Sequence, residues 1–168
     1  MEVKDALLKR RSIRKYLDKE VSDEIIEELL HAAMSGPSAC NRRPWIFYVI
    51  KDQDKLNELR KASRFSNMNA PLAIVVVGDL SRSLPIQLKD FWIQDCSAAT
   101  ENILLRATDL GLGSLWCGIY PQKRPVERVK EILGITNSDI PLNIIYIGYG
   151  DEEKESRDQY EKNRVKII

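Results

Sequence analysis

Residues Arg10–Arg14, with the sequence RRSIR, place three guanidinium groups and one hydroxyl within five positions, directly after the short amphipathic stretch Val3–Lys9. Arginine carries a planar fork of donors that matches the geometry of a phosphate group, and it keeps its charge at working pH. Such a cluster at the end of a helix can bind a phosphorylated ligand. A short basic run is also typical of a solvated turn, so the cluster taken alone leaves both interpretations open.

A second candidate site is the segment Gly36–Trp45, which contains small residues, two prolines and an amide. Small residues let the backbone approach a flat ligand closely, and the Asn41 amide offers both a donor and an acceptor. Trp45 is expected to pack in the core. Taken alone, the segment is first of all a turn-rich loop between a helix and a strand, and a functional role needs further support.

The third candidate is the segment Gly111–Gly118, in which two glycines close a helix and a short strand follows. In the dinucleotide fingerprint GxGxxG, the glycines follow a strand and open a helix, so this segment does not match it. No GxxxxGK[ST] phosphate loop occurs either.

The chain lacks the side chains for several common chemistries. It has one histidine, His31, and three widely spaced cysteines, Cys40, Cys96 and Cys117. We therefore expect no metal site, no Ser-His-Asp triad and no disulfide. A cationic cluster that can bind a phosphate, in a chain without an acid–base set, favours a protein that uses a bound cofactor for its chemistry.

The composition indicates a single domain over residues 1–168. Hydrophobic residues make up 43% of the chain, and the net charge of +1 argues against nucleic acid or an anionic membrane as partner. The longest apolar run, Leu72–Val77, is too short to span a membrane. The first residues lack an apolar leader segment, and we expect a cytoplasmic location with reduced cysteines.

Hydrophobic periodicity and turn residues predict alternating helices and strands, which indicates an α/β or α+β class. Ser22 is the expected N-cap of the second helix, and Pro125 the expected first residue of the last helix. Helices are predicted at 3–9, 23–34, 54–62, 88–110 and 125–133, and strands at 45–50, 72–77, 115–119 and 142–149. The tail ends in the weakly alternating residues Val165–Ile168, which suit either an arm docked on a second subunit or a frayed terminus.

Four stretches in this order resemble the motifs of the nitroreductase family of FMN-dependent oxidoreductases. Residues 10–16 resemble its opening RRSxRxF/Y motif, and residues 37–45 its PSxxNxQPW loop. Residues 95–102 and 110–116 resemble its long helix and GLGSxW turn. Residues 147–150, followed by basic tail residues, resemble its IGYP segment. The likeness extends over nearly the whole chain, which would be a compact member of the family.

The resemblance implies an α+β fold in which a mostly antiparallel sheet is flanked by helices. It further implies an intertwined homodimer with two FMN sites at the subunit interface. Residues 151–168 would form an arm that embraces the partner, and Val165–Ile168 would add a strand to the partner's sheet. No nucleic acid, membrane or metal partner is implied.

The site residues implied by the resemblance fall into three groups. The phosphate and ribityl chain of FMN would be held by Arg10, Arg11, Ser12 and Arg14, with Arg157 and Arg164 as further phosphate ligands. The ring would be bordered by Pro37, Ser38, Ala39 and Asn41 of the other subunit, and by Asn69 and Trp116. The backbone N–H groups of Cys117 and Gly118 would approach flavin N5, so that no catalytic side chain is required there.

The implied activity is hydride transfer from NADH or NADPH through FMN to a nitroaromatic or quinone acceptor by a ping-pong mechanism. The alternatives are a specialised relative (a dehalogenase, dehydrogenase or flavin-consuming enzyme), a non-catalytic FMN-binding sensor, and a structural dimer. Two departures from the family pattern bear on the substrate pocket. Arg42 and Arg43 replace a polar residue and Gln, and residues 80–91 leave little room for lid helices.

Overall fold

Four antiparallel strands form one sheet in the computed structural model, which describes residues 1–168 apart from the side chain of Ile86. In spatial order the strands are β1 (Trp45–Ile50), β2 (Leu72–Gly78), β4 (Ile140–Gly148) and β3 (Gly113–Gly118). Each neighbouring pair is antiparallel. The edge strands are therefore β1 and β3, and β3 carries one of the motifs singled out in the sequence.

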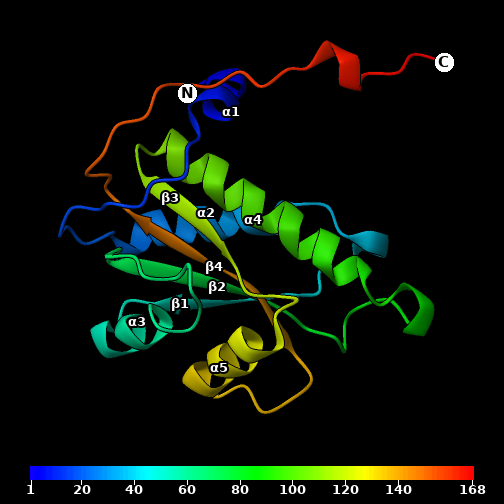
Figure 1. The fold of residues 1–168 in the computed structure, drawn as a ribbon. Coiled ribbons are helices and arrows are strands. Elements are labelled where there is room, and N and C mark those ends of the chain that lie inside the picture. Colours follow the sequence, from blue (N-terminus) through cyan, green and yellow to red (C-terminus); the bar gives the residue numbers. More distant parts are fainter.

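Helices cover both faces of the sheet (Figure 1). On one face lie α2 (Asp23–Met34) and the long α4 (Phe91–Asp109), with α1 (Val3–Lys9) against α4. On the other face lie α3 (Gln53–Leu59) and α5 (Lys123–Leu133). This arrangement confirms the expected α+β class, with an antiparallel sheet flanked by helices.

The central strand β2 is buried along its whole length, as the continuous apolar run predicts. Alternate side chains point to opposite faces of a strand. Ile74 and Val76 accordingly pack with α2 and α4, whereas Val75 and Val77 pack with α3 and α5. Two apolar cores, one on each face, thus hold the sheet in the middle of the molecule.

The helix boundaries follow local capping. The Ser22 hydroxyl accepts a hydrogen bond from Ile25 N at 3.4 Å, which confirms it as the cap of α2. The prediction for α5 is wrong by two residues, because the helix begins at Lys123 and Pro125 is its third residue. The N–H groups of a helix's first turn lack intrahelical acceptors, so proline costs no hydrogen bond at this position.

Other boundaries shift by a few residues. The third helix is Gln53–Leu59, because the Asp52 carboxylate caps it at Lys55 N (2.9 Å) and the chain turns after Leu59. The long helix begins only at Phe91, after a single 3-10 turn over Ile86–Leu88. Between residues 80 and 91 the backbone thus forms this 3-10 turn and no α-helix.

The C-terminal tail crosses the molecule beside α1 and then runs away from it (Figure 1). It contains one 3-10 turn, Lys162–Arg164, and its last apolar residues are exposed, with Ile167 at 96%. Val165–Ile168 form no strand within this single chain. Among the described residues, no helix is both long and apolar enough to cross a membrane.

Gly78 tests the packing between the sheet and α4. A Cβ atom at this position would lie 2.3 Å from Cε3 of Trp92, whose side chain is buried. We expect Gly78→Ala to lower the free energy of unfolding by about 1–3 kcal/mol, because overpacking forces a buried ring out of place. Urea unfolding measures this. Gly118→Ala, whose Cβ would meet nothing within 4 Å, is the matched control, and equal midpoints for the two variants would contradict this packing.

Candidate functional site

The arginine cluster lies on an extended segment that runs along the free edge of β3. Ile13 N donates to Ser114 O at 3.0 Å, and Ser12 forms a parallel bridge with Ser114. The Ile13 side chain takes the space that a side chain on Gly113 would need, since a Cβ there would lie 2.8 Å from Ile13 Cγ2. Glycine at the start of β3 is thus required for the close approach that fixes the arginines.

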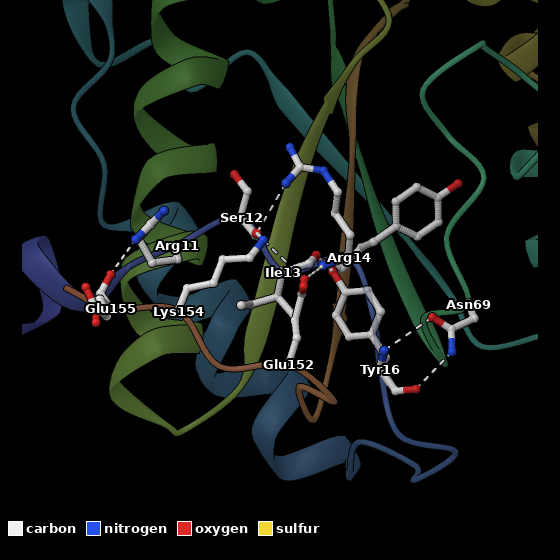
Figure 2. A network of polar contacts seen from close by, with 10 residues as sticks. Arg11, Ser12, Ile13, Arg14, Tyr16, Asn69, Glu152, Lys154 and Glu155 are labelled. Atoms are coloured by element: carbon white, nitrogen blue, oxygen red, sulfur yellow. Dashed lines mark hydrogen bonds and ion pairs between the residues drawn. The ribbon is translucent and has the colours of Figure 1, made fainter. Parts of the chain in front are cut away.

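Tyr16 fixes the other end of this segment (Figure 2). Its backbone N–H donates to Asn69 Oδ1 at 3.2 Å, and Asn69 Nδ2 donates to the Tyr16 carbonyl at 2.9 Å. The phenol oxygen lies 2.6 Å from the Ile13 carbonyl, and burial raises the pKa of Tyr16 above its ordinary range. The Asn69 amide, predicted to be a flavin neighbour, thus uses both its oxygen and its nitrogen to bond to the backbone of this segment.

The tail closes over the same segment from the other side (Figure 2). Lys154 Nζ donates to the Ser12 carbonyl at 2.6 Å, and Arg14 N donates to Glu152 Oε1 at 2.6 Å. The Arg11 guanidinium donates to the Glu155 carbonyl. Residues that are more than 130 positions apart in the sequence thus form one polar cluster.

These contacts enclose a cavity of about 220 Å³, called the anion cavity below. It is lined by Leu7, Arg10, Arg11, Ser12, Arg14, Lys154, Arg157 and Gln159. The lining contains five cationic side chains and no carboxylate. The structure brings Arg157 into the cavity but not Arg164, which pairs with Glu161 in the exposed turn of the tail at 2.7 Å. Arg164 is thus placed too far along the tail to serve this cavity in its own chain.

Carboxylates outside the anion cavity neutralise part of its charge. Arg10 lies 3.6 Å from Glu101, and Lys154 lies 3.2 Å from Glu152. Burial raises the pKa of Glu101, and the hydrogen bond from Arg14 N lowers the pKa of Glu152. The remaining three cations, Arg11, Arg14 and Arg157, have no ion pair among the described residues. This donor set fits a phosphate group, which carries nearly two negative charges and three acceptor oxygens.

A second, larger cavity of about 420 Å³ shares Arg14 with the anion cavity and is called the edge cavity below. It is lined by Arg14, Arg64, Phe65, Asn67, Met68, Leu115, Trp116, Cys117 and Gly118. Its floor is the free edge of β3 beyond the point where residues 12 and 13 cover that edge. Two cavities that share a lining arginine suit a planar ligand that carries a phosphate.

The pairing of β3 decides which backbone donors face the edge cavity. In an antiparallel ladder the N–H and C=O of one residue point to the same side, and alternate residues point to opposite sides. Ser114 faces the free edge through its bond with Ile13, whereas Ile119 N donates to Leu142 O on the β4 side. The Gly118 N–H consequently faces the free edge. The Cys117 N–H faces β4, which removes it from the predicted pair of donors.

The cysteines are free thiols, as expected. Cys117 Sγ is buried 3.7 Å from Ser63 Oγ, and burial raises its pKa. Burial likewise raises the pKa of Cys96 to about 12. A buried thiol with a raised pKa is a poor nucleophile, which argues against covalent catalysis by either side chain. Around the lone His31, which is exposed beside Glu27, nothing suggests a catalytic set. No three His, Cys, Asp or Glu side chains gather as a metal site within the described residues.

The loop Pro37–Trp45 lines neither cavity of its own chain. It is held by Asp95 Oδ1, which accepts from Ala39 N at 2.9 Å, and by Ser38 Oγ, which accepts from Arg43 N at 2.9 Å. Its conformation is strained, because three non-glycine residues, Cys40, Asn41 and Arg43, have φ of 50°, 53° and 51°. Strain of this kind is typical of functional loops. Trp45 packs in the core, as predicted.

Sequence reasoning missed several lining residues. Lys154 could have been suspected from its place beside Arg157 in the charged tail. The segment Ser63–Met68 carried no motif, and its place in the edge cavity depends on the turn after α3. The missed residues of the two cavities are Leu7, Arg64, Phe65, Asn67, Met68, Leu115, Lys154 and Gln159.

Fold and site together define an α+β domain in which the anion cavity and the edge cavity share the lining residue Arg14. The chain belongs to the nitroreductase family, whose sequence model, described as "Nitroreductase family", matches residues 7–71 and 62–149. The family resemblance read from the motifs is therefore confirmed.

Individual relatives agree with this membership. A protein of Methanothermobacter thermautotrophicus named "Putative NADH dehydrogenase/NAD(P)H nitroreductase" is 41% identical over 99% of this chain and 87% of its own length. A structure of the same name from Parabacteroides distasonis has a TM-score of 0.92 at 34% identity, covering 98% of this chain and 96% of that one. An "FMN-dependent Nitroreductase" from Clostridium difficile has a TM-score of 0.88 at 36% identity, covering 96% of each chain.

Asn69 tests how the arginine segment is held. Asn69→Ala leaves two partly buried backbone groups of Tyr16 without partners, and we expect it to lower the free energy of unfolding by about 1–3 kcal/mol. Asn67→Ala is the matched control, because Asn67 is an exposed amide two residues away in the same turn. Thermal and urea unfolding of both variants measure the difference. If the two variants unfold alike, the hydrogen bonds between Asn69 and the Tyr16 backbone do not contribute to stability.

Proposed function

We propose that the protein is an FMN-dependent oxidoreductase that takes electrons from NADH or NADPH and delivers them to a small electron-poor acceptor. One observation supports this most strongly: Arg14 lines both the anion cavity and the edge cavity. The first suits the phosphate of FMN and the second its planar ring. The printed names of the relatives, which include an FMN-dependent nitroreductase, favour the same cofactor.

In this proposal the arginine segment and the tail bind the cofactor together. Arg10, Arg11, Arg14 and Arg157, with the missed Lys154, surround the phosphate, and Ser12 lies between phosphate and ribityl chain. The Gly118 N–H faces the ring from the β3 edge, where a fixed donor stabilises negative charge that develops on reduction. When bound, FMN supplies the redox chemistry: it accepts a hydride from NAD(P)H and passes two electrons to the acceptor.

The lining of the edge cavity includes no His, Asp or Glu side chain, which suits an acceptor that needs no protein acid or base. Quinones and nitroaromatics take up two electrons readily and draw their protons from solvent. The donor and the acceptor would use the same edge cavity in turn, which is a ping-pong mechanism. The three free cysteines suit a reducing compartment, and we place the enzyme in the cytoplasm.

The working unit in this proposal is a homodimer. The loop residues Pro37, Ser38, Ala39 and Asn41, which line neither cavity in their own chain, would border the ring in the second copy. The exposed residues Val165–Ile168 would add a strand to the partner's sheet. Exposed apolar side chains at the end of a long extended tail support such an exchange, because docking removes them from water.

Arg14 is the residue that tests the cofactor. We expect Arg14→Ala to weaken FMN binding by about 10- to 100-fold, since a hydrogen bond to a charged group contributes about 1.5–3 kcal/mol. Arg124→Ala, an exposed arginine on α5, is the control and should bind FMN as the wild type does. Equilibrium titration followed by flavin absorbance measures both. Equal affinity of Arg14→Ala and wild type, or a wild type that binds no FMN, would contradict the proposal.

Removing residues 165–168 tests the arm. The lining of the anion cavity ends at Gln159, so the truncated chain should fold and keep its cations while its dimer dissociates more readily. Analytical ultracentrifugation over a dilution series gives the dimer dissociation constant, which we expect to rise at least tenfold. An unchanged constant would rule out strand exchange by this tail.

A further inference from the structure

Arg64 and Phe65 lie at the edge cavity, and no part of the proposed cofactor binding uses them. The Phe65 side chain is 64% exposed, which is unusual for a phenylalanine that lines a cavity. The Arg64 guanidinium carbon lies 5.4 Å from the centroid of the Phe65 ring, within the range of a cation–π contact. The two side chains therefore form one unit that combines an aromatic face with a positive charge.

The turn that presents this unit is fixed from inside. Ser66 is fully buried, and its hydroxyl lies 2.9 Å from the Ser63 carbonyl and accepts from Ser63 N at 2.9 Å. Arg60 Nε donates to the Met68 carbonyl at 2.6 Å, which joins the end of α3 to the far side of the turn. A turn bonded in this way presents Arg64 and Phe65 toward solvent without free movement of its backbone.

The charge of Arg64 has no assigned partner. The edge cavity is lined by two cations, Arg14 and Arg64, and by no carboxylate. Arg14 also lines the anion cavity, where a phosphate would engage it, whereas Arg64 lines the edge cavity alone. No ion pair or side-chain hydrogen bond of Arg64 is formed within the described residues. Its positive charge is thus left for a second anion that enters beside the ring.

We propose that Arg64, packed against Phe65, selects substrates that carry an anionic group next to a planar, reducible ring. This inference rests on the proposed function and narrows its substrate class. The anion can belong to the acceptor, as a carboxylate or sulfonate, or to the donor, as the nicotinamide nucleotide phosphate. In both cases the planar part lies over the flavin while the anion meets the guanidinium at the rim.

Binding to the oxidised, FMN-loaded dimer tests the proposal without turnover. The acceptor probes are 4-nitrobenzoate and its neutral counterpart 4-nitrobenzamide, with dissociation constants taken from the perturbed flavin absorbance. We expect the wild type to bind the carboxylate about three- to tenfold more tightly than the amide, the range for a partly exposed charge pair. Arg64→Gln should abolish this preference and leave amide binding unchanged. Added salt should weaken the preference in the wild type.

The donor arm uses reduced nicotinamide mononucleotide and the phosphate-free reduced nicotinamide riboside in anaerobic flavin reduction. If the anion comes from the donor, Arg64→Gln slows flavin reduction by the mononucleotide about three- to tenfold at low donor concentration. The rate of flavin reduction by the riboside is then unchanged. Arg124→Gln, on α5 and in the lining of neither cavity, should behave as wild type throughout. Arg64→Lys should restore part of the preference, because it keeps the charge.

Three results would overturn the inference. The first is a flavin-loaded wild type without charge preference in either arm. The second is an Arg64→Gln variant that binds the charged and the neutral probes more weakly to the same extent. This would indicate that Arg64 contributes through the shape of the cavity and not through its charge. The third is a variant that binds FMN more weakly while its preferences are intact, which would assign Arg64 to the cofactor. A wild type without a flavin band would instead overturn the proposed function, which distinguishes the two failures.

Discussion

The close contact between Ile13 and the start of β3 is the constraint on which the site depends. One hydrogen bond, from Ile13 N to Ser114 O, and one missing side chain, at Gly113, bring the arginine segment against a sheet edge. Because Ile13 and Tyr16 point into the core, the residues between and before them are left outside it. The core therefore determines where the guanidinium groups lie, and no loop has to hold them by itself.

The same contact divides the edge of β3 into two parts. Its first residues are covered by the arginine segment, and its last residues form the floor of the edge cavity. An uncovered sheet edge is normally an aggregation hazard because its donors and acceptors lack partners. Here the free N–H of Gly118 lies where a ligand can use it. The unpaired strand edge thus offers a backbone donor to a ligand, and Arg14 lines both the edge cavity and the anion cavity.

Much of the fold could be predicted from the sequence, because short-range signals determine its elements. The aromatic and β-branched run Trp45–Ile50 and the stretch Val3–Lys9 have the predicted bounds. Contacts between distant residues could not be predicted in the same way. Lys154 reaches the Ser12 carbonyl and Arg164 does not reach the anion cavity, because the path of the tail is set by its bonds to the arginine segment and to α1. The side of β3 that Cys117 N–H faces likewise depends on pairing register.

The central claim is that this cationic cavity exists to hold the phosphate of a flavin. Isothermal titration of the protein with FMN and with riboflavin, which lacks only that phosphate, tests it most directly. Several charge-assisted hydrogen bonds separate the two ligands, so the account predicts that FMN binds at least about 100-fold more tightly. Equal affinity for FMN and riboflavin, or binding of neither, would contradict it.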